Sequence, residues 1–350
     1  MPDVDLTELE RFSHRVLEAS GLPSEDAALV AASVGYAHRH GKGTHGAGRL
    51  PIYVERLRKG LMNARTPLAE ISCAPALALL DAGDGFGQVA AARGMDRAVE
   101  MARQAGIGLV GIRHSHNFGT AAFVAARAVE AGMAAVVLSN AAPAIAPTGG
   151  RRAVFGTNPI AFGFPAPDGH PPVILDMATS VAARGKIRQA AASGEAIPPG
   201  WALDADGAPT TDPAAALVGS MLPIGGAKGY GLSVVVDIMA GLMTRSASGG
   251  AARNLNNPDG PSRCGHMLIA IDVGRLVPKA DYEADMEKLI EATRGSGAPG
   301  EVLLPGERSA RHMDGRGGLV ALSDAVCAKL DALAAERGLE PLPRQEGQAR

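Results

Sequence analysis

Residues 107–140 read IGLVGIRHSHNFGTAAFVAARAVEAGMAAVVLSN, and this stretch indicates the fold class more clearly than any other. Residues 107–114 and 134–140 are rich in β-branched and apolar side chains, as strands are. Between them, Ala121–Glu130 has the Ala-rich composition and the apolar spacing of a helix. A strand, a helix and a second strand in succession predict an α/β region.

The alternation continues on both sides of this stretch. Strands or extended segments are predicted at 77–82, 153–165, 172–178, 266–273 and 301–307, and helices at 88–104, 181–194, 228–245 and 280–294. The two ends of the chain are predicted to be helical. The first helix is predicted over Leu6–Ala19, and the second begins at an N-cap at Ser24 and runs to about His38. The last helix begins at an N-cap at Ser323 and runs to about Arg337.

Composition narrows the function classes. The chain has 350 residues, 46% of them hydrophobic, which is enough for a large core in about two domains. It carries 34 Lys and Arg against 36 Asp and Glu, with only 3% aromatic residues, and this balance argues against binding to nucleic acid or an anionic membrane. Leu232–Met243 is too short to span a bilayer.

The cysteines and the N-terminus predict a cytoplasmic location. Cys73, Cys264 and Cys327 lie far apart without a CxxC pair, which argues against a disulfide framework and a zinc site. The N-terminal sequence MPDVDLTELERF is acidic and amphipathic, unlike a signal peptide.

Two motifs have structural explanations that outweigh the functional ones. Residues 83–90, GDGFGQVA, follow a strand, open a helix and fit GxGxxA, but the next strand ends in Arg113-His114 without the acid that a dinucleotide fold offers to ribose. A glycine-rich turn without a ligand is therefore the favoured interpretation. His38, His40 and His45 lie close together, but no carboxylate or thiolate is near them in sequence, so no metal site is predicted.

Residues 44–53, THGAGRLPIY, are a stronger candidate for chemistry. Arg49 can grip a carboxylate with two parallel hydrogen bonds. His45 can transfer a proton near neutral pH, and Thr44 places a hydroxyl beside it. A solvated turn before a surface helix is the alternative.

A second polar stretch, RHSHNFG at 113–119, follows a predicted strand, and ligands gather at such strand ends in open α/β sheets. A loop with satisfied histidines is the alternative. FGTNP at 155–159 and DMATS at 176–180 also follow extended runs, and the grouping of these loops is more informative than each alone.

Together the motifs resemble the malate/L-lactate dehydrogenase family of the second type. That family is unrelated in fold to ordinary lactate and malate dehydrogenases, and it includes sulfolactate, ureidoglycolate and diketogulonate enzymes and cyclic-imine carboxylate reductases. The resemblance spans about residues 5–340. It rests on THGAGRLPIYVERLRKG, SHNFGTAA, FGTNPIAFGFP, LDMATSVAARGKI, IPPGWALDADG, GGAKGYGLSVVVDIMAGL and LLPGE.

The resemblance implies an α/β fold that is not a Rossmann fold. A NAD(P)-binding domain with a mixed, largely antiparallel sheet is expected over residues 76–309. Residues 1–75 and 310–350 are expected to form a helical domain for substrate binding and dimerisation, in a homodimer.

The resemblance also implies residue roles. His45 is similar to the proton donor of the family, with Thr44 in place of the usual Ser and His116 as a rival acid/base. The substrate contacts that it implies are Arg49, Tyr53 and Thr157. The cofactor contacts are Asn117, Phe118, Gly119, Thr120, Ala121, Asp176, Met177, Ala178, Lys228, Gly229, Leu304, Pro305, Gly306 and Glu307.

These expectations describe an enzyme that uses NAD or NADP to interconvert a small 2-oxo acid and a 2-hydroxy acid, of the malate, lactate or sulfolactate type. A reductase of a cyclic imine 2-carboxylate is the alternative among enzymes. Lys186, where the imine branch favours an acid, tilts the choice toward 2-oxo acids. An alternative outside the enzymes is a dimer that binds a ligand without catalysing a reaction.

Overall fold

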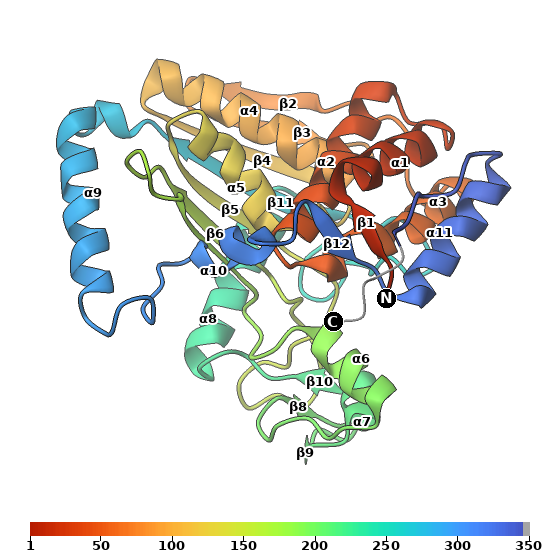
Figure 1. Ribbon diagram of the computed structural model, residues 1–350. Helices are drawn as coiled ribbons and strands as arrows, with labels where there is room; N and C mark the ends of the chain where they lie inside the picture. The colour runs from red at the N-terminus through yellow and green to blue at the C-terminus, as the bar shows by residue number, and fades with distance from the viewer. Residues whose placement is uncertain (346–350) are drawn as a thin grey trace.

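A computed structural model describes residues 1–345, and a seven-stranded mixed sheet forms its centre (Figure 1). The strands, in their order across the sheet, are β2 (Ala69–Ala74), β3 (Leu77–Asp81), β4 (Ile107–Ser115), β11 (Cys264–Ile271), β5 (Ala134–Ser139), β6 (Ile160–Phe164) and β7 (Val173–Met177). Only β3 and β4 are parallel neighbours, and every other pair in this sheet is antiparallel. The predicted largely antiparallel, non-Rossmann sheet is therefore confirmed.

Strand β11 occupies the middle of the sheet. Met267 lies opposite Gly111 of β4 on one side and opposite Leu138 of β5 on the other. Nearly all of β11 is buried. An uninterrupted apolar sequence such as that of residues 264–271 is typical of a strand covered on both faces.

Two helices cover one face of the sheet at close range. They are α4 (Gly87–Ala105) and α5 (Ala121–Glu130). A Cβ on Gly108 would lie 2.0 Å from the Ala98 carbonyl oxygen, and one on Gly94 would lie 2.6 Å from Ile112 Cδ1. The Ala- and Gly-rich sequence thus permits a helix-to-strand distance that larger side chains would prevent.

The other face packs against α8 (Ala227–Val236) and the π-helix η3 (Asp237–Leu242). The sequence predicted one regular helix over 228–245, so the prediction is wrong in its second half. A Cβ on Gly265 of β11 would lie 1.7 Å from the Ala240 carbonyl oxygen. The strand therefore passes directly beneath the π-helical turn.

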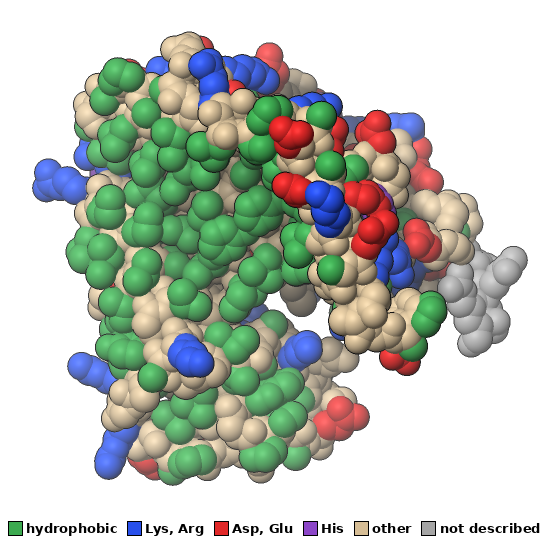
Figure 2. All heavy atoms as spheres, turned by 90° about the vertical axis from the view of Figure 1, so that its left-hand side faces the viewer, with side chains coloured by type: hydrophobic (Ala, Val, Ile, Leu, Met, Phe, Trp, Pro, Cys, Tyr) green, Lys and Arg blue, Asp and Glu red, His purple; other side chains and the backbone are tan. Residues whose placement is uncertain are grey.

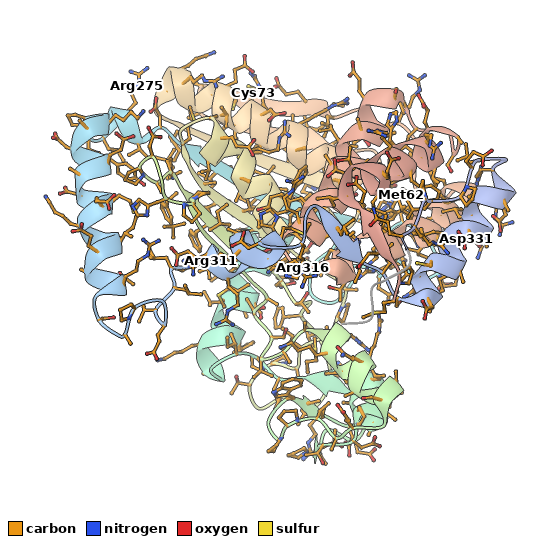
Figure 3. All side chains as sticks on the ribbon, viewed as in Figure 1. Met62, Cys73, Arg275, Arg311, Arg316 and Asp331 are labelled. Carbon is orange, nitrogen blue, oxygen red and sulfur yellow. The ribbon has the colours of Figure 1, made fainter. Side chains whose placement is uncertain are left out.

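The terminal segments form one helical region. It contains α1 (Leu6–Glu18), α2 (Ser24–Arg39), α3 (Leu50–Arg58) and α11 (Asp324–Glu336), while β1 (Asp3–Asp5) pairs with β12 (Leu319–Ala321). Figure 3 shows Met62 beside the first helices and Asp331 on α11 at the same end of the molecule. Ser323 caps α11 as predicted, but Pro23 rather than Ser24 precedes α2 as its N-cap.

Residues 181–222 form a small lobe that the sequence did not predict as a unit (Figure 1). Its elements are α6 (Arg184–Ser193), α7 (Pro213–Val218) and the short strands β8 (Ala202–Leu203), β9 (Pro209–Thr210) and β10 (Ser220–Met221). Ile187, Ile197 and Met221 are buried in a separate apolar cluster. The division of the chain into two domains stays a prediction, and its residues 346–350 lie outside the described part.

Residues 301–307 were predicted as a strand followed by a turn, and only the turn is present. These residues form a turn that leads from α9 (Lys279–Arg294) into α10 (Glu307–Ala310). The Glu307 carboxylate accepts a hydrogen bond from the Leu304 N–H at 2.9 Å, which closes the turn. Within residues 1–345, no helix has the length and apolar character needed to cross a membrane.

Candidate active site

A cleft of about 1360 Å³ lies where the helical region, the ends of several strands and the small lobe meet. It gathers many of the predicted site residues from distant parts of the chain. Those that line it are Thr44, His45, Arg49, Asn117, Phe118, Gly119, Thr120, Ala121, Thr157, Asp176 and Ala178.

Residues 43–49, which we call the catalytic turn because they contain the predicted catalytic residues Thr44 and His45, connect α2 to α3 through two short 3-10 helices. His38 of α2 supports it, because its Nε2 accepts a hydrogen bond from the Ala47 N–H at 3.0 Å. Burial lowers the pKa of His38 to about 4, which keeps the ring neutral and able to accept. A Cβ on Gly46 would lie 2.2 Å from the same nitrogen, so this position of the turn requires glycine.

Three functional side chains meet within the catalytic turn. The Thr44 hydroxyl lies 3.2 Å from His45 Nδ1 in a hydrogen bond. The Arg49 Nε donates to the Thr44 backbone carbonyl at 2.9 Å. That bond fixes the stem of the guanidinium while its two terminal nitrogens carry no hydrogen bond to residues 1–345. The turn thus offers a hydroxyl, an imidazole and a cationic fork to the same cleft.

His45 is neutral at pH 7 in this environment. Burial lowers its pKa to about 4, and the positive charges of Arg49 and Lys42 add to the effect. A neutral imidazole is ready to accept a proton. An anion bound beside Arg49 would offset the neighbouring positive charge and raise the pKa.

Lys42 and Asp176 also line the cleft, and Lys42 was not among the predicted site residues. Lys42 Nζ lies 3.8 Å from an Asp176 carboxylate oxygen, which also accepts from the Ala122 N–H at 3.3 Å. Burial raises the pKa of Asp176, against the lowering effect of Lys42. The pair ties the catalytic turn to β7 and to the first turn of α5.

The structure does not bring His116 or Tyr53 to the surface of the cleft. Both are fully buried. Neither ring nitrogen of His116 has a hydrogen-bond partner among residues 1–345, and burial, with the charge of Arg56 next, lowers its pKa to about 3. The Tyr53 hydroxyl accepts from Gln88 Nε2 at 2.8 Å beneath the catalytic turn. Direct contact of either ring with substrate is not supported by this geometry.

Several predicted cofactor residues also lie apart from the cleft. The Pro305 carbonyl accepts from the Ile174 N–H at 3.0 Å, which places the turn at 304–307 beside the start of β7 rather than beside Asp176. A Cβ on Gly229 would lie 2.1 Å from the Ile224 carbonyl oxygen, so this glycine serves close packing in α8. Residues outside the lining are Met177, Lys228, Gly229, Leu304, Pro305, Gly306 and Glu307.

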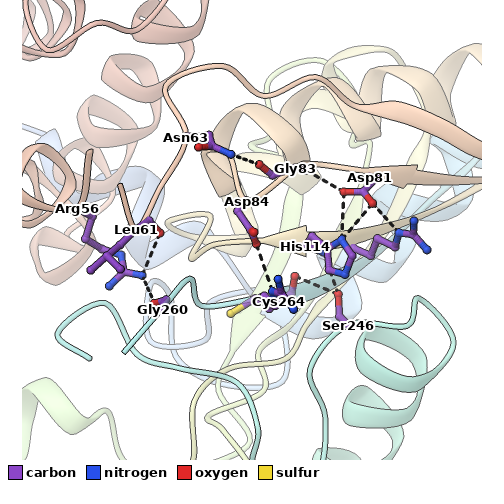
Figure 4. A network of polar contacts seen from close by, with 12 residues as sticks. Arg56, Leu61, Asn63, Asp81, Gly83, Asp84, His114, Ser246, Gly260 and Cys264 are labelled. Carbon is purple, nitrogen blue, oxygen red and sulfur yellow. Dashed lines mark hydrogen bonds and ion pairs between the residues drawn. The ribbon is translucent and has the colours of Figure 1, made fainter. Parts of the chain in front are cut away.

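One wall of the cleft is a loop at residues 253–262. Arg56 of α3 holds it in place. Its guanidinium donates to the carbonyls of Leu255 at 3.0 Å and Asn257 at 3.0 Å. It also donates to the Gly260 carbonyl at 2.9 Å (Figure 4). Arg56 therefore joins the helix that follows the catalytic turn to the loop facing it.

The glycine-rich turn at 83–87 packs closely against neighbouring segments of the same chain. A Cβ on Gly87 would lie 2.2 Å from the His116 carbonyl oxygen, and one on Gly85 would lie 2.5 Å from the Thr66 hydroxyl. Nearby, the Asp81 carboxylate pairs with Arg113 Nε at 2.8 Å and with His114 Nδ1 at 3.1 Å (Figure 4). The structural interpretation of this glycine motif therefore accounts for each position.

The histidines near residue 40 have separate partners. His38 binds the Ala47 N–H, His40 Nδ1 contacts the Tyr36 carbonyl at 2.9 Å, and His45 contacts Thr44. No group of three or more His, Cys, Asp or Glu side chains suited to a metal ion occurs within the described part of the chain.

Comparison with known proteins gives relatives over nearly the whole length. The chain is 38% identical to a (2R)-3-sulfolactate dehydrogenase (NADP(+)) of Chromohalobacter salexigens over 335 residues, 95% of this chain and 98% of that protein. It is also 38% identical to a Δ1-pyrroline-2-carboxylate reductase of Ancylobacter novellus over 338 residues, 94% of this chain and 97% of that protein.

A solved structure agrees with these relatives. The sulfolactate dehydrogenase of Methanocaldococcus jannaschii superposes with a TM-score of 0.90 at 33% identity, over 96% of this chain and 98% of that one. The family model described as malate/L-lactate dehydrogenase matches residues 4–331. The protein therefore belongs to the malate/L-lactate dehydrogenase family.

Proposed function

We propose that this protein is an NAD(P)-dependent dehydrogenase that interconverts a small 2-oxo acid and the corresponding 2-hydroxy acid. The observation that supports this most directly is the catalytic turn, which presents Thr44, His45 and Arg49 to one large cleft. Relatives named as sulfolactate dehydrogenases support the same class of substrate.

The cleft has the size and the donors for a dinucleotide together with a small acid. Its volume, about 1360 Å³, exceeds the roughly 300–1,000 Å³ of common small-molecule sites. The N-terminus of α5 faces it through Thr120 and Ala121, and the buried Thr120 hydroxyl has no partner in residues 1–345. Backbone N–H groups at a helix N-terminus favour phosphate. We therefore infer that residues 117–121, Asp176 and Ala178 hold the cofactor.

The nicotinamide supplies the hydride when the cofactor is bound. Arg49 would orient the substrate carboxylate with its two free terminal nitrogens, and such orientation can supply several kcal/mol of the barrier. His45 would exchange a proton with the substrate oxygen, while Thr44 holds its Nδ1. Thr keeps the hydroxyl needed for this contact, and it adds a methyl group that stiffens χ1.

Because its pKa is low, His45 is neutral in the free enzyme, and this form can accept a proton but not donate one to the substrate oxygen. Neutral His45 is the base needed to oxidise a hydroxy acid. Reduction requires proton uptake, which an anionic substrate beside Arg49 would promote by offsetting its charge.

We also infer a homodimer. The exposed side of α8 and η3 presents Leu232, Val235, Ile238, Leu242 and the adjoining Met243. Figure 2 shows hydrophobic side chains spread over a broad area of this side of the molecule. A monomer rarely exposes so large an apolar area, which supports a second copy as its partner. A cytoplasmic location stays a prediction, supported by three free cysteines.

A substrate and cofactor panel tests the proposal. Purified protein should oxidise NADH or NADPH with oxaloacetate, pyruvate or sulfopyruvate, as followed by absorbance. Turnover of pyrroline-2-carboxylate or piperideine-2-carboxylate alone would replace the proposal with imine reduction, the activity named for the Ancylobacter novellus relative. Absence of turnover with every acid, together with absence of nicotinamide binding by calorimetry, would favour a non-catalytic ligand-binding dimer.

A further inference from the structure

The small lobe contacts the catalytic turn at Gly185. Gly185, the second residue of α6, lies against Thr44, and a Cβ at 185 would lie 3.1 Å from Thr44 Cγ2. The methyl group that distinguishes Thr from Ser therefore packs against the start of α6. This contact places the first turns of α6 beside Thr44 and His45.

Two arginines on α6 share the face that turns to the cleft. Arg184 and Arg188 are four residues apart, so they lie on one side of the helix, and both line the cleft with Gly185. Arg184 Nη2 donates to the Leu217 carbonyl at 2.7 Å, which ties it to the small lobe. Arg188 is exposed and makes no hydrogen bond or ion pair with residues 1–345. Burial lowers the pKa of Arg184, and the charge of Arg188 lowers it further.

The charges that line the cleft are mostly positive, although the whole chain has a formal net charge of −2. The cations are Lys42, Arg49, Arg58, Arg184, Arg188, Arg253, Lys329 and Arg337, and the acids are Glu55, Asp176 and Glu336. Lys42 forms an ion pair with Asp176, and Arg58 forms one with Glu55. The other six cations have no carboxylate partner within residues 1–345, and two of them lie close to the predicted reacting groups: Arg49 on the catalytic turn and Arg188 on α6, one turn beyond Gly185.

We propose that Arg188 binds a second anionic group at the far end of the substrate while Arg49 binds the carboxylate next to the reacting carbon. A guanidinium offers two parallel hydrogen bonds that match a carboxylate or a sulfonate. The protein then selects 2-oxo acids with two anionic groups over those with one. This inference rests on the proposed function and names its substrate class.

Kinetics of Arg188→Ala, Arg188→Lys and Lys186→Ala test it. Lys186 makes a matched control, since it lies on the same helix, carries the same charge and is exposed as Arg188 is, but lies outside the cleft lining. Arg188→Ala should lower kcat/KM for oxaloacetate and sulfopyruvate by about 10- to 100-fold, the loss expected for one charged hydrogen-bonded contact. Pyruvate should change by less than about 3-fold, and Arg188→Lys should fall between, because the charge remains and the fork is lost.

Two kinetic outcomes would overturn the inference. One is an equal loss for pyruvate and oxaloacetate, or the same loss in Lys186→Ala. The other is a raised KM for NADH or NADPH with unchanged selectivity between the acids, which would assign Arg188 to a cofactor phosphate.

Calorimetry separates this inference from the proposed function. Malate should bind the wild type and Lys186→Ala more tightly than it binds Arg188→Ala, and lactate should not discriminate among the three. Arg188-dependent malate binding without turnover of any acid would refute the proposed function alone. Turnover of 2-oxo acids with selectivity independent of Arg188 would refute this inference alone.

Discussion

His45 and His116 both have a strongly lowered pKa, yet the structure gives them opposite surroundings. His45 lines the cleft and has a hydroxyl partner in Thr44. His116 is fully buried, and neither of its nitrogens has a partner within the described residues. A lowered pKa therefore does not identify a proton donor by itself, because burial alone produces it. The two histidines differ in access to the cleft, which His45 reaches and His116 does not.

The largest effect should follow removal of the accessible imidazole. His45→Ala should lower kcat by on the order of 100-fold or more, because it removes the proton-transfer group. Steady-state kinetics with saturating cofactor measure this. His45→Ala with near-normal turnover would move the role to another group, and His116 would be examined next.

Arg49→Lys should raise the KM for the acid by about 10-fold, because Lys keeps the charge but loses the two-pronged contact. Its kcat should change much less, since the proton donor is intact. Initial rates over a range of acid concentrations separate the two constants. A KM equal to that of the wild type would exclude Arg49 from the substrate site.

The pH dependence of oxidation reports the pKa of His45 in the free enzyme. Its pKa of about 4 means that the basic form persists on acidification, so kcat/KM for the hydroxy acid should stay level between pH 8 and pH 5. A histidine with the ordinary pKa near 6.5 would lose about 30-fold in its neutral form between pH 8 and pH 5. Rates in overlapping buffers distinguish the two, and a decline that begins near pH 6.5 contradicts the environment described for His45.

His116→Gln should reduce stability more than activity. In the native protein the pKa of His116 is about 3, below its unfolded value near 6.5, so unfolding takes up a proton when the pH falls below 6.5. The stability that it contributes is complete above pH 6.5 and declines toward the folded pKa. At pH 7 the free energy of unfolding of the variant should be about 1–3 kcal/mol below that of the wild type. Between pH 6 and pH 4 the unfolding free energy of the wild type should fall more steeply than that of the variant, by about 1.4 kcal/mol per pH unit, because only the wild type takes up the extra proton on unfolding.

Urea unfolding at several pH values measures both quantities for His116→Gln. A kcat reduced as strongly as in His45→Ala, with unchanged stability, would instead give the buried histidine a catalytic role.

The smallest effect should come from Thr44→Ser. Serine keeps the hydroxyl that contacts His45 Nδ1 and removes only the methyl group beside Gly185. We expect kcat within about 3-fold of the wild type, because the hydrogen bond persists and only a small packing contact is lost. Thr44→Val, which is similar in size but lacks the hydroxyl, is the matched comparison, and equal rates in the two variants would remove the hydroxyl from the mechanism.

The sequence predicted local features well and long-range ones poorly. Thr44, His45 and Arg49 lie within one turn, so their proximity follows from the chain itself, and most helices lie where apolar spacing placed them. By contrast, Arg188 and the loop at 253–262 enter the cleft from separate elements. Their meeting depends on tertiary packing, which leaves no pattern in any single stretch of sequence.

Some predicted site residues lie away from the cleft for a similar reason. The turn at 304–307 and Lys228 matched family motifs, but these residues lie outside the cleft lining in this chain. Tyr53 has the periodicity of α3, and its hydroxyl meets Gln88 in the core rather than a ligand. A motif match identifies a position in sequence, whereas exposure to the cleft depends on what packs over it.

The central place of β11 has a consequence for synthesis of the chain. Strands β4 and β5 leave the ribosome early, but each pairs with residues 264–271, which emerge more than a hundred residues later. Until then both strands have unpaired edges, and such edges are prone to aggregate. Nascent chains that stop before residue 264 should therefore require a chaperone to remain in solution, and the sheet should close only after translation of the last third has begun.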